Sequence, residues 1–250
     1  MASRPLITLT FLLALALTGC HRDPAQGSHS GNQAFPYPVS KSWAHCVSTV
    51  ELGRARAPLF DGMEVDMNYS DWQDRLFMGH NLCDTSWGLT FGMWLDSLPQ
   101  PVTECLWLDI KNLTPDNASR VAHQVLAAAR RHGIVDRVMV EHSHAEALRI
   151  VKDSGLHVIL WVDNPWWSGS SEEEFRARTQ AQIDSLHPDA LSGDYHNFPR
   201  LPEAFPDQNI HIWDTPREYN DTNVAHSRTI MQHPAVKVVL VDYPLPVDAL

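Results

Sequence analysis

The chain has 250 residues, of which 44% are hydrophobic and 20% are charged. This composition is typical of a soluble globular protein, and the length suits one large domain such as an α/β barrel. The formal net charge of -11 at pH 7 argues against a nucleic-acid partner held through phosphate contacts. The sequence gives no indication of a protein partner.

The N-terminal residues have the pattern of an export signal. Arg4 precedes an apolar run over residues 5–17, which is too short to span a bilayer as a mature helix. The run ends in Leu17-Thr18-Gly19-Cys20, which resembles the bacterial lipobox, in which the cysteine is lipidated after cleavage. We therefore expect a signal peptide over residues 1–19, a lipidated tether over residues 20–40 that starts at Cys20, and a barrel domain over residues 41–250.

The expected tether is rich in glycine, serine, proline, glutamine and asparagine, which is typical of a flexible linker. His21 rather than an aspartate follows the cysteine. By the usual bacterial sorting pattern this favours an anchor in the outer membrane, with the domain in the periplasm.

Short apolar runs alternate with helical patterns through the rest of the chain. Eight strands are expected, over residues 43–47, 63–69, 105–111, 137–141, 157–162, 190–194, 209–213 and 236–241. Residues 76–79 are expected to extend the second strand or to pair with it as a hairpin, and helices are predicted over 115–131, 145–152 and from about 170 to 186. Eight buried strands alternating with helices favour a single-domain (β/α)8 TIM barrel over a doubly wound sheet.

The polar residues support the barrel, because they follow the strands at their carboxyl ends. In a barrel these ends meet at one mouth, where active sites lie. The residues are His45, Glu64, Asp66, Asp109, Lys111, Glu141, Asp163, Asp194, Asp214 and Asp242.

The stretch Asp61-Gly-Met-Glu-Val-Asp-Met-Asn-Tyr69 carries the most informative pattern. Its alternation predicts a strand with Glu64 and Asp66 on one face, ~7 Å apart along the strand. Two carboxylates on a buried face repel each other, and a divalent cation compensates for that repulsion. With Asp109 they form a set of three hard oxygen ligands suited to Mg²⁺ or Ca²⁺.

Five elements follow one another in this order along the chain: Ala44-His45, Glu64-x-Asp66, Gly79-His80-Asn81, Leu108-Asp109-Ile110-Lys111 and Asp242-Tyr243-Pro244. Together they resemble the signatures of the glycerophosphodiester phosphodiesterase superfamily of barrels. Three positions depart from the usual signatures, since Cys46 replaces an arginine, Asn81 an acid and Asp109 a glutamate. The Asp-x-Lys and the cysteine after the second histidine are similar to the sphingomyelinase D branch. Trp43-Ala-His45, Glu64-x-Asp66 and Leu-Asp-x-Lys are also similar to the menorin family.

The resemblance implies a His45 and His80 pair acting as acid and base, with Glu64, Asp66 and Asp109 as metal ligands. Lys111 would neutralise charge on the phosphate. Trp161, Asp194 and Trp213 are expected to contact the substrate, and Glu141, Asp163 and Asp214 are weaker candidates. A zinc site at His142-Ser-His144 is disfavoured, because zinc hydrolases need three close ligands. Trp166 and Trp167 suggest a lip that faces lipid or sugar.

Three cysteines follow Cys20, and an exported compartment permits a disulfide. Cys46 and Cys83 are expected at the barrel mouth, whereas Cys105 begins a strand at the opposite end. A Cys46–Cys83 disulfide is therefore predicted.

The sequence thus predicts a metal-dependent phosphodiesterase for glycerophosphodiesters, lysophospholipids or related envelope phosphodiesters. One alternative is a non-catalytic lipid-anchored barrel that binds a phosphorylated or sugar ligand. Another is a glycosidase that uses two carboxylates at the mouth, whose activity would be indifferent to chelation.

Overall fold

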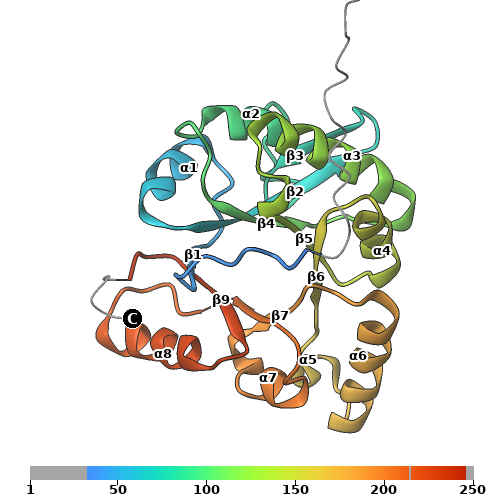
Figure 1. Cartoon of the computed structure of the whole chain (residues 1–250), viewed down its shortest axis with the longest axis vertical. Coiled ribbons are helices and arrows are strands. Elements are labelled where there is room, and N and C mark those ends of the chain that lie inside the picture. Colours follow the sequence, from blue (N-terminus) through green and yellow to red (C-terminus); the bar gives the residue numbers. More distant parts are fainter. Residues whose placement is uncertain (1–32, 214, 246–250) are drawn as a thin grey trace, which may run out of the picture.

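Eight parallel strands form a closed barrel in the computed structural model, which describes residues 33–213 and 215–245 (Figure 1). The strands are β1 (Ser42–Ala44), β2 (Gly62–Ser70), β4 (Cys105–Ile110), β5 (Val138–His142), β6 (His157–Trp161), β7 (Ala190–Asp194), β8 (Ile210–Trp213) and β9 (Val236–Val241). β1 pairs in parallel with both β9 and β2, which closes the sheet. The predicted (β/α)8 barrel is confirmed.

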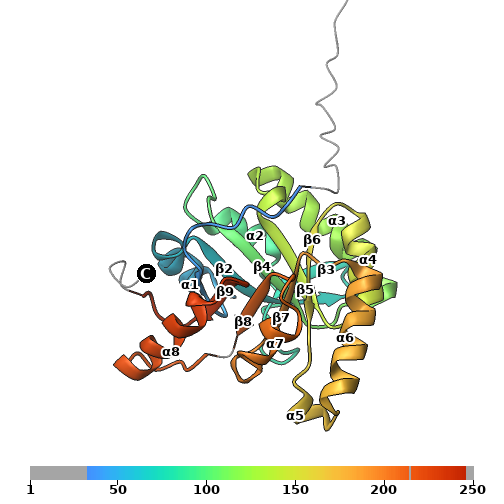
Figure 2. The same cartoon turned by 60° about the horizontal axis from the view of Figure 1, so that its bottom comes forward.

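Helices surround this barrel (Figures 1 and 2). They are α1 (Val50–Arg56), α2 (Phe91–Ser97), α3 (Pro115–His132), α4 (Ala145–Asp153), α5 (Pro165–Ser168), α6 (Glu172–Leu186), α7 (Arg200–Ala204) and α8 (Asp221–Gln232), with short 3-10 turns η1 (Ala57–Leu59), η2 (Val135–Arg137) and η3 (Tyr195–Asn197). The three helices predicted from the sequence are α3, α4 and α6. The ends of α3 follow the expected signals, with Pro115 in its first turn and Gly133 in the left-handed conformation after it.

One strand runs against the others. β3 (Arg75–Met78) pairs antiparallel with β2, with Met78 opposite Met67 and Arg75 opposite Ser70. Of the two possibilities for residues 76–79, the hairpin is therefore the one observed. The hairpin returns the chain to the mouth of the barrel, where the Gly79-His80 pair follows.

The alternation along β2 separates two cores. Met63, Val65 and Met67 belong to the large cluster that includes the helices' apolar faces. A second cluster, which includes Trp43, Trp107, Met139, Ile159, Val238 and Leu240, comes from the opposite faces of the strands and fills the barrel interior. Glu64 and Asp66 lie on that interior face, above the apolar filling, and both are buried. The interior is therefore packed with apolar side chains toward the end where the strands begin, and it is polar at their carboxyl ends.

Residues 33–41 close the lower end of the barrel, where the strands begin. Phe35 is buried there with Trp43. The Tyr37 hydroxyl is hydrogen-bonded to His211 Nε2 at 3.0 Å. Burial lowers the pKa of His211 to about 3, so this imidazole stays neutral inside the barrel.

The close approach of Gly62 to a buried tryptophan predicts a stability effect. A Cβ on Gly62 would lie 2.2 Å from the ring of Trp43, which is fully buried. We expect Gly62→Ala to lower the free energy of unfolding by about 2–3 kcal/mol, because overpacking displaces a side chain that has no space to move. Gly88→Ala is the matched control, since nothing lies within 4 Å of its Cβ position. Urea unfolding of both variants tests this, and equal midpoints would contradict it.

The expected signal peptide (1–19) and the expected lipidation site Cys20 lie outside the described residues, as do most of the tether and Asp214. Within the described part of the chain, no helix is long and apolar enough to cross a membrane.

Candidate active site

A cavity of about 370 Å³ opens at the carboxyl ends of the strands. Its lining combines charged groups, histidines and tryptophans. The lining residues are His45, Glu64, Asp66, His80, Trp107, Asp109, Lys111, Glu141, His142, Ser143, Trp161, Trp213 and Leu240. All six residues predicted to be catalytic or metal-binding are therefore in one cavity, together with two of the three predicted substrate contacts.

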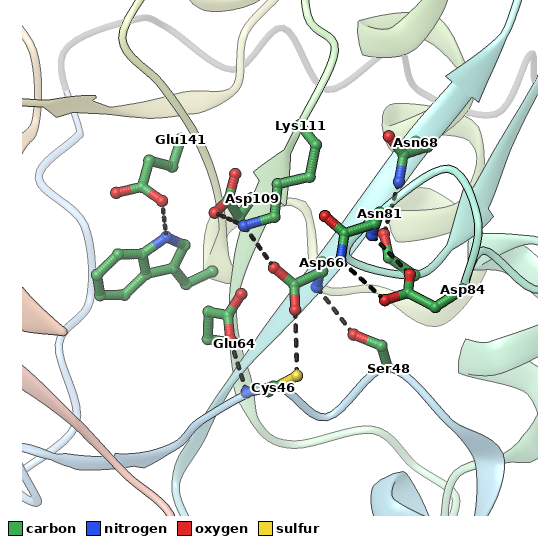
Figure 3. Close-up of polar contacts among 12 residues, drawn as sticks. Cys46, Ser48, Glu64, Asp66, Asn68, Asn81, Asp84, Asp109, Lys111 and Glu141 are labelled. Atoms are coloured by element: carbon green, nitrogen blue, oxygen red, sulfur yellow. Dashed lines mark hydrogen bonds and ion pairs between the residues drawn. The ribbon is translucent and has the colours of Figure 1, made fainter. Parts of the chain in front are cut away.

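Three carboxylates converge in this cavity (Figure 3). Glu64 and Asp66 come from β2 and Asp109 from β4, where it is the register partner of Asp66. One oxygen of each lies within 4.8 Å of the others. Burial, with repulsion from Asp66 and Asp109, raises the pKa of Glu64 well above its usual value, and burial also raises the pKa of Asp109. A divalent cation offsets this repulsion, so the three oxygen donors fit Mg²⁺ or Ca²⁺.

Lys111 lies between two of the carboxylates. Its Nζ is 2.7 Å from Asp66 Oδ1 and 2.5 Å from Asp109 Oδ2. Burial alone would lower the pKa of Lys111, but Asp109 and Asp66 outweigh that effect and raise it. The ammonium group is therefore charged, and because Lys111 also lines the cavity it can pair with an anionic ligand there.

The loop after β1 supports the same cluster. Cys46 adopts a left-handed backbone conformation with φ 54°, and its N–H donates to Glu64 Oε2 at 2.7 Å. The Cys46 thiol donates to Asp66 Oδ2 at 3.2 Å (Figure 3). Burial and the neighbouring Asp66 raise the pKa of this thiol to about 12, so it stays protonated and serves as a donor.

The predicted Cys46–Cys83 disulfide is wrong, because both residues are free cysteines. The Cys46 thiol is directed at Asp66, while Cys83 is exposed in the loop that follows β3. Asn81 and Asp84 hold this loop through two hydrogen bonds of 2.6 and 3.1 Å. Asn81 therefore stabilises its own loop.

His45 and His80 enter the cavity from different elements. His45 follows β1, and its Nδ1 lies 3.1 Å from Asp242 Oδ1, just after β9. This contact occupies one ring nitrogen and leaves Nε2 available. His80 follows Gly79, which has φ 142° and donates its N–H to the Asp66 carbonyl at 2.9 Å. A Cβ on Gly79 would lie 2.5 Å from Thr85 Cα, so only glycine allows this turn into the cavity.

Aromatic side chains line the part of the cavity that β6 and β8 provide. The rings of Trp161 and Trp213 are 6.5 Å apart, and Trp167 of α5 is 6.5 Å from Trp213. Glu141 also lines the cavity; it is buried and accepts hydrogen bonds from Trp107 Nε1 at 2.9 Å and from the Ser192 hydroxyl. Burial, with repulsion from Asp109, raises the pKa of Glu141 to about 8.

Asp194 was predicted to contact the substrate, but it is not part of the cavity lining. Its carboxylate is 1% exposed and accepts hydrogen bonds from the backbone N–H of His196 and from the Asn164 side chain. Asp194 is the N-cap of η3. Through these hydrogen bonds the carboxylate holds the loop after β7 in place. This explains why Asp194 does not face the mouth, although it ends a strand.

Four lining residues were not predicted, namely Trp107, His142, Ser143 and Leu240. Trp107 could have been predicted from the sequence, because alternation with a period of two along β4 puts it on the same face as Asp109.

His142 Nδ1 accepts a hydrogen bond from the backbone N–H of His144 at 3.0 Å, and burial lowers the pKa of His142 to about 4. Among the described residues, Glu64, Asp66 and Asp109 form the only group with the geometry of a metal site, and neither His142 nor His144 belongs to it.

Several solved structures share this fold. A protein of Silicibacter pomeroyi DSS-3 assigned as a glycerophosphoryl diester phosphodiesterase superimposes with a TM-score of 0.65 and 14% identity, over 86% of this chain and 93% of that chain. An Oleispira antarctica phosphodiesterase in complex with the product sn-glycerol-3-phosphate gives a TM-score of 0.62 and 13% identity, over 83% and 94%. A glycerophosphodiester phosphodiesterase of Parabacteroides distasonis gives 0.59 and 13%, over 82% and 93%.

This chain has the fold of the glycerophosphodiester phosphodiesterases. The sequence itself matches no protein-family model and no curated protein. At these identities the similarity shows the fold, and the chemistry depends on the residues of the cavity.

Proposed function

We propose that this protein is a metal-dependent phosphodiesterase for glycerophosphodiesters, lysophospholipids or related envelope phosphodiesters. The observation that carries the proposal is the convergence of three carboxylates, a lysine and two histidines in one cavity at the mouth of this barrel. The product in the Oleispira antarctica complex is itself a phosphate monoester, which supports a small phosphodiester as the substrate.

Glu64, Asp66 and Asp109 would hold the divalent cation, Mg²⁺ or Ca²⁺. When bound, such a cation supplies Lewis-acid stabilisation to the phosphoryl oxygens. Lys111 contacts two of these carboxylates and is placed to pair with a phosphate oxygen, which offsets the charge that develops during the displacement. The thiol and backbone N–H of Cys46 orient Asp66 and Glu64.

His45 and His80 would transfer the protons. One histidine takes the proton from the attacking hydroxyl or water, and the other protonates the oxygen that leaves phosphorus. Asp242 holds the His45 ring through Nδ1, which orients Nε2 for proton transfer. A hydroxyl of the substrate itself is a second possible nucleophile and would give a cyclic phosphate.

We further propose that Cys20 is lipidated and that the protein is anchored in the bacterial outer membrane, facing the periplasm. The lipobox-like Leu17-Thr18-Gly19-Cys20 and the polar residues that follow support this proposal. Mass spectrometry of the membrane-bound protein tests it. An N-terminus that retains residues 1–19, or a Cys20 without acyl chains, would contradict it.

Metal removal tests the enzymatic proposal. We expect phosphorus NMR to show hydrolysis of glycerophosphodiesters with Mg²⁺ or Ca²⁺, a loss of at least about 100-fold with a chelator, and recovery when metal is restored, because Lewis-acid stabilisation is worth several kcal/mol. The product's chemical shift separates an open from a cyclic phosphate.

Two other outcomes correspond to the alternatives. Ligand binding without turnover, unaffected by His45→Ala, would support a non-catalytic binding protein. Hydrolysis of glycosides that is insensitive to the chelator would support a glycosidase.

A further inference from the structure

The cavity has little positive charge of its own with which to bind a phosphodiester anion. Among the described residues that line it, Lys111 is the only lysine or arginine. Its Nζ already contacts the carboxylates of Asp66 and Asp109. A phosphate group that enters beside these carboxylates therefore binds more tightly if a second cationic side chain reaches it from the rim of the mouth.

The loop after β8 carries an arginine to this rim. Three alternate residues of the loop contact β9 and the chain that follows it: Thr215 contacts Leu240, Arg217 contacts Asp242, and Tyr219 contacts Tyr243. The first contact is a hydrogen bond from the Thr215 hydroxyl to a carbonyl, and the last is an edge-on packing of two rings. Arg217 is thus held between two anchored neighbours, on the side of the loop that faces Asp242.

Asp242 connects Arg217 with the cavity. Oδ1 of Asp242 lies 3.1 Å from Nδ1 of His45, which lines the cavity. Arg56 of α1 donates a hydrogen bond to the backbone carbonyl of Asp242 at 2.7 Å and fixes its position. Oδ2 of the same carboxylate faces Arg217. The guanidinium group is therefore separated from a proposed proton-transfer residue by a single carboxylate.

The ion pair between Arg217 and Asp242 is long and exposed. Nε of Arg217 lies 3.7 Å from Oδ2, which is beyond hydrogen-bond distance, and the Arg217 side chain is 73% exposed. An exposed pair of this kind contributes little to stability, so the guanidinium group can leave Asp242 at small cost. Its planar set of N–H donors matches two oxygens of a phosphate group.

We propose that Arg217 is a substrate-binding residue, which turns from Asp242 to pair with the phosphodiester anion beside His45. The inference rests on the proposed function for the identity of the substrate. It assigns a role to a residue that lies outside the cavity lining. Because the chain has a net charge of -11, a cation at the mouth also favours the approach of an anionic substrate.

Steady-state kinetics with a glycerophosphodiester such as glycerophosphoethanolamine test this role. We expect Arg217→Gln to raise KM about 10-fold and to change kcat by less than about 2-fold, because a charge-assisted contact is lost while the acid and base remain. Arg217→Lys should retain part of the affinity, since it keeps the charge without the planar fork. Arg176→Gln is the matched control, because Arg176 forms an exposed ion pair with Glu172 outside the cavity.

A binding measurement separates this inference from the enzymatic proposal. Calorimetric titration with glycerol 3-phosphate, in the presence of Mg²⁺ or Ca²⁺, needs no turnover. We expect Arg217→Gln to weaken binding about 10-fold and Arg176→Gln to leave it unchanged. This result in a protein without phosphodiesterase activity would support the inference and contradict the proposed function.

Three outcomes would overturn the inference. One is an active wild-type protein whose KM and glycerol 3-phosphate affinity are unchanged by Arg217→Gln, which would leave the proposed function intact. The second is a loss of kcat with unchanged affinity, which would show that Arg217 acts only through Asp242 and His45. The third is a wild-type protein that does not bind glycerol 3-phosphate.

Discussion

Replacing Asp66 by asparagine is expected to lower kcat/KM for glycerophosphodiesters by at least about 1000-fold. Asp66 has partners on both oxygens, since Oδ1 pairs with Lys111 and Oδ2 accepts a hydrogen bond from the Cys46 thiol. The amide has the same shape but removes one of three charges that would hold the cation, and metal stabilisation is worth several kcal/mol. Steady-state kinetics at saturating Mg²⁺ and Ca²⁺ measure this loss.

The same substitution is expected to leave the melting temperature of the metal-free protein unchanged or higher. Asp66 is buried beside two other carboxylates, and removing one charge relieves their repulsion. Asp71→Asn is the control, because Asp71 pairs with Arg120 on the surface, 71% exposed. Full activity of Asp66→Asn, or an equal loss in Asp71→Asn, would contradict the assigned role.

Replacing His45 by alanine is expected to reduce kcat by about 100- to 10,000-fold with little change in metal affinity. This is the usual range for loss of a general acid or base. Asp242→Asn should cost less, about 10-fold, because the His45 ring remains and loses only the charge of its partner at Oδ1. His144→Ala is the control, since His144 is exposed and outside the cavity.

The pH profile adds a measurement that a purely structural role would not change. Loss of His45 should remove one limb of the dependence of kcat on pH, because one of the two proposed proton-transfer groups is gone. An His45→Ala protein with a wild-type profile and kcat would show that this histidine is a structural group at the rim.

Periodicity made the barrel and the carboxylate cluster predictable. Glu64 and Asp66 alternate with buried methionines and valine along β2, so their common face followed from spacing alone. Asp109 could be added because it occupies the same place in the next parallel strand, as the register pairing with Asp66 confirms. These features depend on a local repeat, which sequence reveals well.

Side-chain direction within loops was not predictable in the same way. Asp194 ends a strand at the same end of the barrel as the carboxylate cluster, yet it caps η3 and is not part of the cavity lining. The Cys46 thiol is directed at Asp66 because its backbone adopts a left-handed conformation, which is rare for a residue other than glycine. Both outcomes depend on loop dihedrals and long-range hydrogen bonds, which leave no periodic trace in the sequence.

Residues 33–41 close the end of the barrel opposite the mouth, and this position also determines how the protein would be oriented when it is immobilised. Gln33 lies beside Leu156, His157 and Asp189, where β6 and β7 begin, and the mouth is at the other end of these strands. A bead or electrode linked through the N-terminal side would therefore hold the barrel by its base. Substrate would then reach the cavity from bulk solution, without crossing the support.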